Sequence, residues 1–145
     1  MNHPLPPIVR TAERLLREIE QAVRGFARYH KYTLGTDLRQ QAMTVVRVCH
    51  RAWRDRPRQA HWVDQLRWAI DEIKLSLQMG SQLRAFTSFR QFEMLIRLAE
   101  DLGRQAGGWW RQLQVPKGQN PACDASPERA QILSTRDASF AGANP

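Results

Sequence analysis

The sequence predicts an all-α protein: an antiparallel up-down-up-down four-helix bundle over residues 1–113, followed by a disordered tail over 114–145. Apolar residues recur at three- and four-residue steps in four successive segments, which is the spacing of one buried helix face. Short breaks separate the segments, and short connections favour antiparallel neighbours. From Gln114 onward Pro, Gly, Asn, Ala and Ser dominate and the periodicity stops, as in disordered segments.

The first helix is expected to begin at Pro6–Pro7, because proline is tolerated in a first helical turn. Its apolar face carries Ile8, Ala12, Leu15, Leu16, Ile19, Ala22, Val23 and Phe26. Arginines occupy a narrow sector on the opposite face, flanked by Glu13, Glu18 and Glu20. We interpret that face as solvated and balanced by local ion pairs. Its arginines are Arg10, Arg14, Arg17, Arg24 and Arg28.

A corner at Tyr29–Arg39, with the permissive Gly35 at its changeover, is expected to join the first helix to the second. From Leu38 to Arg54 the second helix contains no acidic residue. Like charges at helical spacing repel each other, so a row of arginines on its outer face indicates an external anion. A neighbouring acidic helix is the alternative partner. The row consists of Arg47, Arg51 and Arg54.

Pro57 ends the second helix, because proline cannot continue one. The third helix then has apolar residues at the spacing of a bundle seam, namely Val63, Leu66, Ile70, Ile73 and Leu77. Trp68 lies nearly opposite this seam. An exposed tryptophan on a polar face is unfavourable unless something covers it, which predicts a subunit or partner contact. A surface tryptophan with no partner is the alternative.

The fourth helix is expected to begin with a capping box at Ser88–Gln91 and to end at Gly107–Trp110. It buries Phe92, Leu95, Ile96, Ala99, Leu102 and Ala106. Arginines recur every seven residues on its outer face with glutamates nearby, a surface ion-pair pattern that contributes little to stability. Met94 and Leu98 lie off the main seam, and we expect them to form a second, smaller apolar contact in an oligomer.

The net charge of +8 is carried mainly by arginine, since only three of the 22 basic residues are lysine. In the tail three basic residues balance three acidic ones, so the excess lies on residues 1–113. Arginine presents a flat fork of donors that suits phosphate and carboxylate, which favours a polyanion or an acidic protein surface as partner. A general arginine bias of the genome is the alternative explanation.

No pattern of residues indicates an enzyme, a metal, a cofactor or a small-molecule substrate. A di-iron bundle needs Glu-x-x-His pairs, but His50 follows Arg47 and His61 follows Arg58 at that spacing. Cys49 falls on an apolar face and is interpreted as a small buried hydrophobe. The first residues do not show the basic region followed by an apolar region that is typical of a signal peptide, and no apolar run approaches the ~18 residues that a membrane span needs. We therefore expect a cytoplasmic protein.

Two motifs resemble one known family. Lys31–Arg39, KYTLGTDLR, is similar to the helix-turn signature of the accessory variability determinant (Avd) family of diversity-generating retroelements. Leu102–Arg111, LGRQAGGWWR, is similar to that family's closing glycine, glycine, tryptophan segment. The resemblance covers about residues 8–111. Family members often have a proline before the corner, and its absence here predicts a first helix that runs straighter into the turn.

The resemblance implies a small basic bundle that assembles as a homopentamer. It would bind the retroelement's reverse transcriptase and template-repeat RNA and support synthesis of adenine-mutagenised cDNA, with no active site of its own. The acid-free second helix points to its arginine row for phosphate contact, with Lys31 and Arg39 in support.

Two alternatives remain at this point. One is a related bundle family encoded by intervening sequences in bacterial large-subunit ribosomal RNA genes, whose usual Ala-Glu-Gly pattern after the corner is absent here. The other is a protein-binding adaptor, whose arginines would meet acidic partners instead of a nucleic acid.

Overall fold

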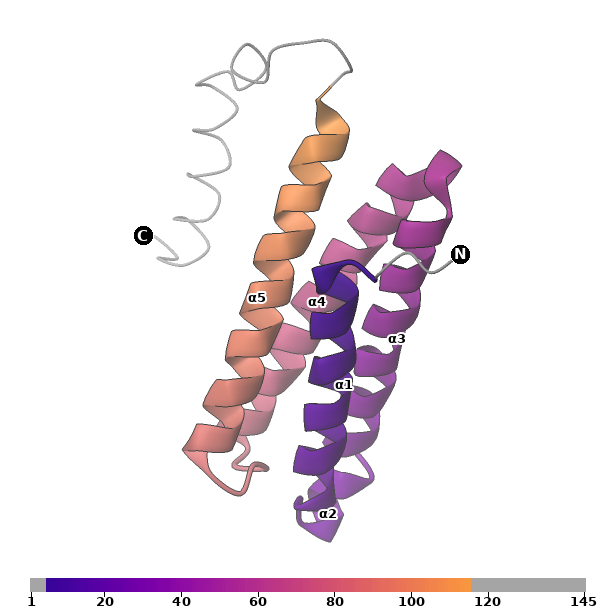
Figure 1. Ribbon diagram of the computed structural model, residues 1–145. Helices are drawn as coiled ribbons and strands as arrows, with labels where there is room; N and C mark the ends of the chain where they lie inside the picture. The colour runs from indigo at the N-terminus through magenta and orange to yellow at the C-terminus, as the bar shows by residue number, and fades with distance from the viewer. Residues whose placement is uncertain (1–4, 116–145) are drawn as a thin grey trace, which may run out of the picture. The chain divides into compact units, whose positions relative to one another are not determined.

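The computed structural model describes residues 5–115, and all regular structure in that range is helical (Figure 1). The four long helices are α1 (Pro7–Arg24), α3 (Leu34–Arg54), α4 (Gln59–Gln82) and α5 (Phe89–Gln114). A short helix, α2 (Arg28–Lys31), precedes α3, and a 3-10 turn, η1 (Arg56–Arg58), joins α3 to α4. The predicted all-α class is confirmed for this range. The expected disordered tail, apart from its first two residues, lies outside the described residues.

The core lies between the inner faces of the four long helices, and no polar or charged residue is buried within residues 5–115. Fully buried side chains come from every long helix and include Leu15, Ile19, Leu38, Val45, Leu66, Ile70, Ile73, Leu77, Leu95 and Leu102. Burying a side chain of this size contributes roughly 1.5–3 kcal/mol, so apolar burial is the main force holding the helices together. Within the described range, no helix combines the length and the apolar character that crossing a membrane would need.

Contacts between α1 and α3 show that these two helices run in opposite directions. Glu20, late in α1, meets Arg39, early in α3, whereas Glu13 meets His50 near the other end of α3. Figure 1 shows the same reversal of direction between successive long helices.

α5 packs between α4 and α1. The Arg67 guanidinium of α4 lies 4.9 Å from the centroid of the Trp110 ring, and on the other side Gln105 Nε2 donates to Thr11 Oγ1 of α1 at 3.2 Å. The helix therefore closes the core on the side opposite α3.

The missing proline predicted a first helix that runs straighter into the corner, but the helix breaks before it. α1 ends at Arg24, and the N–H of Gly25 bonds back to the Ala22 carbonyl oxygen at 3.0 Å, a tight last turn. Gly25 is a poor helix former, and a Cβ at this position would lie 3.0 Å from Thr87 Cγ2. The approach of the α4–α5 loop and the low helix propensity of glycine together explain the break.

Gly35 also has a role different from the predicted one. It lies in the first turn of α3, not at a changeover between helices, and it is buried. A Cβ at Gly35 would lie 2.8 Å from Val23 Cγ1 and 3.3 Å from the His30 carbonyl oxygen. Glycine is therefore needed because α3 approaches α1 closely here, rather than for an unusual backbone conformation.

The predicted end of the last helix at Gly107–Trp110 is wrong, because α5 continues to Gln114. Trp109 packs against the core and Trp110 lies against Arg67, so both rings hold the helix in place beyond the two glycines. Tertiary packing outweighs the weak helix propensity of glycine at this point.

The start of α5 agrees with the predicted capping box in one of its two bonds. The N–H of Gln91 donates to Ser88 Oγ at 3.1 Å, as expected of an N-cap serine. The Gln91 amide oxygen reaches back one residue further than predicted and accepts from the Thr87 N–H at 3.3 Å and from the Thr87 hydroxyl at 3.1 Å.

Candidate nucleic-acid interface

The α3 arginine row, Arg47, Arg51 and Arg54, lies exposed on the outer face of α3. Within residues 5–115 none of its guanidinium groups pairs with a carboxylate. Arg51 is held by an aromatic ring instead, with its Cζ atom 5.1 Å from the centroid of Trp62. Stacking on a ring leaves the in-plane N–H donors of a guanidinium open to a phosphate.

The turn after α3 extends this positive surface. Arg56 and Arg58 lie exposed in η1, and the only acidic residue of the turn, Asp55, is already engaged. Its Oδ2 atom accepts from Trp62 Nε1 at 2.9 Å and lies 3.4 Å from Arg58 Nε. Asp55 therefore neutralises Arg58 and leaves the α3 arginine row uncompensated. Sequence reasoning did not assign Arg56 to the site, although its position between α3 and Pro57 was the available signal.

The two supporting residues lie away from the row. Arg39 is about eight residues, or ~12 Å of helix, from Arg47, and its Nε atom lies 2.6 Å from Glu20 Oε2. Lys31 is half-buried in α2, beyond the start of α3. The structure thus brings Arg47, Arg51 and Arg54 together and leaves Lys31 and Arg39 at the opposite end of α3.

The arginines of α1 differ from expectation, since the predicted local ion pairs are not found in the described part of the chain. Glu13 instead reaches His50 at 3.1 Å, and Glu20 reaches Arg39, so both carboxylates serve α3. The exposed arginines of α1 left without a carboxylate partner in this range are Arg10, Arg14, Arg17 and Arg24, and Arg28 at the start of α2 likewise has none. α1 therefore presents a second positive face.

α5 shows the opposite arrangement. Arg97 lies 3.5 Å from Glu93 and Arg104 lies 3.5 Å from Asp101, all on the outer face of the same helix. These exposed pairs add little to stability, but they neutralise the charge locally. Ion pairs are thus present on this face, but not the predicted ones: Glu93 pairs with Arg97 instead of Arg90, and Asp101 instead of Glu100 provides the second carboxylate.

The three residues predicted to form an oligomer contact differ in exposure. Trp68 is 62% exposed, and Leu75 and Met79 lie exposed seven and eleven residues further along α4, on the same face. Met94 and Leu98 are half-buried and pack against the core. The exposed apolar face of α4 is therefore larger than predicted, and the seven- and four-residue spacing was the signal for Leu75 and Met79.

The titratable side chains of the core include a thiol that is poorly suited to nucleophilic chemistry. Cys49 is fully buried, and that burial, together with the nearby negative charge of Glu13, raises the pKa of the thiol to about 12. It stays protonated at neutral pH. Among residues 5–115, no three His, Cys, Asp or Glu side chains gather closely enough to hold a metal ion.

Taken together, the outer faces of α1 and α3 can attract and hold phosphate groups, whereas on α5 two of the four outer arginines are neutralised by carboxylates of the same helix. Phosphate contacts of this kind supply affinity without reading sequence. Neither a protein-family model nor a curated protein matches this chain.

Proposed function

We propose that this protein is a non-enzymatic accessory protein of a diversity-generating retroelement, which binds the reverse transcriptase and the template-repeat RNA and supports mutagenic cDNA synthesis. The observation that carries the proposal is the α3 arginine row, three exposed guanidinium groups with no carboxylate partner in the described chain. The two motifs that resemble the Avd family direct this RNA-binding activity to a retroelement.

Phosphate is favoured over an acidic protein surface by the shape of the site. The positive charge extends along two long helices, and Arg51 is already positioned by its stack on Trp62. A long polyanion can contact many such groups at once, and each phosphate neutralised releases condensed counterions from the nucleic acid. A folded protein partner rarely offers acidic groups over such a length.

The assembly we propose is a homopentamer of antiparallel, up-down-up-down bundles, each formed by residues 1–113. The exposed apolar face of α4, formed by Trp68, Leu75 and Met79, supports a contact between copies, because such a face is unfavourable in water. A ring would place several α3 arginine rows on one surface. Linked weak contacts then raise the overall affinity without any new interaction.

The first test compares two triple variants in RNA-binding titrations at several salt concentrations. Arg47→Ala, Arg51→Ala and Arg54→Ala together should weaken binding to template-repeat RNA and to an unrelated hairpin alike. The slope of log affinity against log salt should fall by about 2–3, since three phosphate contacts are lost. The matched control removes three arginines from the outer face of α5, Arg90, Arg97 and Arg104. It should change affinity and slope less, because the last two are already paired with carboxylates.

Equal losses in both triple variants, with the helical fold intact by circular dichroism, would show that only net charge matters and that the α3 assignment is wrong. The retroelement itself is tested by the neighbourhood of the gene. A reverse-transcriptase gene and an imperfect repeat that differs at adenines should lie nearby. A ribosomal RNA gene in their place would favour the intervening-sequence alternative.

A further inference from the structure

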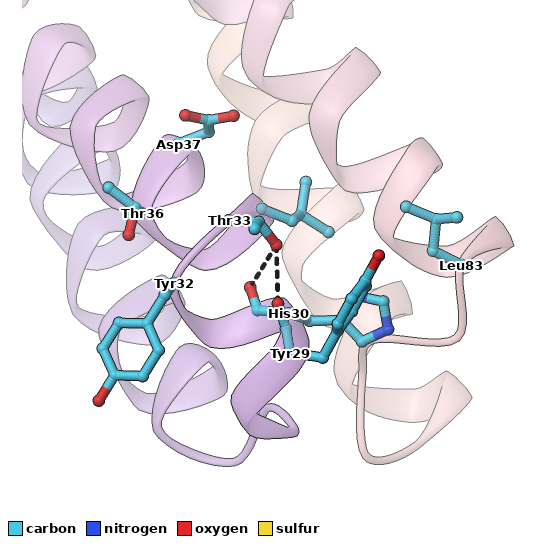
Figure 2. A pocket seen from close by; sticks show the side chains of 8 residues that line it. Tyr29, His30, Tyr32, Thr33, Thr36, Asp37 and Leu83 are labelled. Carbon is cyan, nitrogen blue, oxygen red and sulfur yellow. Dashed lines mark hydrogen bonds between the residues drawn. The ribbon is translucent and has the colours of Figure 1, made fainter.

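An open pocket of about 450 Å³ lies where the turn between α2 and α3 faces the end of α4 (Figure 2). The two tyrosines of the whole chain, Tyr29 and Tyr32, both line it, together with His30. Leu83, after the end of α4, forms the facing wall. The pocket therefore combines aromatic surface from one segment with an apolar wall from a distant one.

The two tyrosine rings are unusually exposed for side chains of their size. Tyr29 is 80% and Tyr32 70% exposed, and the only ring contact of either within residues 5–115 is the edge of His30, 5.2 Å from Tyr29 between centroids. Aromatic rings beside a hollow offer flat faces on which another ring system can stack. In proteins that bind single-stranded nucleic acids, such rings stack on the bases.

Polar groups complete the pocket. The Thr33 hydroxyl donates to the Tyr29 carbonyl oxygen at 3.0 Å, which fixes the turn that carries both tyrosines (Figure 2). Asp37 lines the pocket with an exposed carboxylate that pairs with no cation in the described range. A carboxylate in this position can accept hydrogen bonds from the N–H groups on the edge of a base.

Beside the pocket the backbone holds an arginine in a conformation that favours glycine. Arg84 directly follows Leu83 and has a φ of 59°. Its N–H bonds to the Ser81 carbonyl oxygen at 3.1 Å, and that of Ala85 bonds to Gly80 at 2.9 Å. These are the bonds of a Schellman helix end, where the left-handed position is usually glycine. A side chain kept at a strained position motivates a hypothesis of function, and Arg84 directly follows a residue that lines the pocket.

We propose that this pocket binds an unpaired base of single-stranded RNA. The base stacks on one of the two tyrosine rings, which point to opposite sides of the turn in Figure 2. The N–H groups of the base donate to Asp37, and Arg84 contacts an adjoining phosphate. This site deepens the proposed function and rests on it. Asp37 lies about ten residues, or ~15 Å of helix, from Arg47. One structured RNA can therefore place a paired segment along the α3 arginine row and an unpaired nucleotide in the pocket.

The test uses two labelled probes, an eight-nucleotide oligouridine and a blunt-ended RNA hairpin, in anisotropy titrations. Tyr29→Leu together with Tyr32→Leu should weaken binding of the oligouridine about tenfold, with no change in salt slope and no loss for the hairpin. Replacing both tyrosines by phenylalanine keeps the rings and should restore the affinity. The control is Phe89→Leu, which removes an equally exposed ring (70%) that does not line the pocket.

Arg84→Gly gives an independent readout, because its two effects should have opposite signs. Glycine relieves the backbone strain, so Tm should rise by about 3 °C. Loss of one phosphate contact should weaken oligouridine binding and lower its salt slope by about 1. If Tm rises and binding is unchanged, Arg84 has no part in the site.

The outcomes separate this inference from the proposed function. If the wild-type protein binds both probes and the tyrosine variants bind oligouridine normally, the pocket assignment is wrong and the α3 assignment stands. If the wild-type protein binds neither probe, the proposed function fails, and the pocket assignment fails with it.

Discussion

α3 and α5 are both long helices with arginines on their outer faces, yet their surfaces differ electrostatically. On α5, Arg97 and Arg104 lie within 3.5 Å of carboxylates on the same helix. On α3, the row of Arg47, Arg51 and Arg54 has no acidic neighbour on its own helix from Leu38 onward. The positions of the carboxylates, rather than the number of arginines, decide which face is open to phosphate.

On α1, contacts with a neighbouring helix decide where the carboxylates lie. It has glutamates beside its arginines, as α5 does, but Glu13 and Glu20 turn across to His50 and Arg39 of α3. A carboxylate close in sequence therefore does not neutralise an arginine when a neighbouring helix offers it another partner.

The largest expected effect concerns the inner faces, where the two helices should be equivalent. Leu38 of α3 and Leu102 of α5 are both fully buried. Truncation of either to alanine should lower the free energy of unfolding by about 3 kcal/mol, through lost burial and the cavity left behind. Urea unfolding measures both, with the exposed Leu75→Ala as a near-neutral control. A loss under ~1 kcal/mol for Leu102→Ala alone would mean that α5 is only weakly docked.

The next prediction concerns the pH dependence of stability, to which Cys49 on the inner face of α3 contributes. Cys49 of α3 is held protonated in the folded protein because its pKa is raised from 9.0 to about 12. The unfolded chain releases this proton above pH 9, so alkali favours unfolding. Between pH 8 and 10.5 the stability of the wild type relative to Cys49→Ala should fall by about 2 kcal/mol. Parallel curves for the two proteins would show that the thiol ionises equally in both states.

A smaller effect should follow when the carboxylates of α5 are neutralised. Glu93→Gln with Asp101→Asn leaves Arg97 and Arg104 without their partners and makes the outer face resemble that of α3. RNA affinity should rise about fivefold with a steeper salt slope, while the free energy of unfolding changes by less than ~0.5 kcal/mol. Unchanged affinity would indicate that something other than local pairing keeps RNA from this face.

The smallest effect should follow when a carboxylate is added to the outer face of α3. Met43→Glu places a carboxylate four residues before Arg47, the order that stabilises a helix. Stability should rise by about 0.3 kcal/mol, and RNA affinity should fall about threefold as the first arginine of the row is neutralised. Met43→Gln is the matched control, since it has the same length without the charge. Equal behaviour of the two variants would contradict a role for Arg47.

Sequence periodicity predicted the inner faces well, because a buried helix face imposes its own spacing on apolar residues. Leu15, Leu66 and Leu102 lie in the core as expected. The break before Pro57 and the Ser88 cap were also predictable, since each depends on a few adjacent residues. The resemblance to the Avd family stays a prediction.

What could not be predicted depended on contacts between distant segments. α5 continues through two glycines because Trp109 and Trp110 are held by other helices. Gly35 is required by the approach of Val23, which lies in another helix. The corner pocket likewise joins Tyr29 to Leu83, and no local pattern links the two.

The cross-helix bonds of Glu13 and Glu20 have a thermodynamic consequence. In the unfolded chain these carboxylates stay close to the arginines of α1, and docking of α3 draws them away. Folding thus creates part of the positive surface, so a polyanion that binds this surface binds the folded chain more tightly than the unfolded one. Linkage then requires the polyanion to stabilise the fold in return, and the melting temperature of the protein should report the concentration of RNA around it.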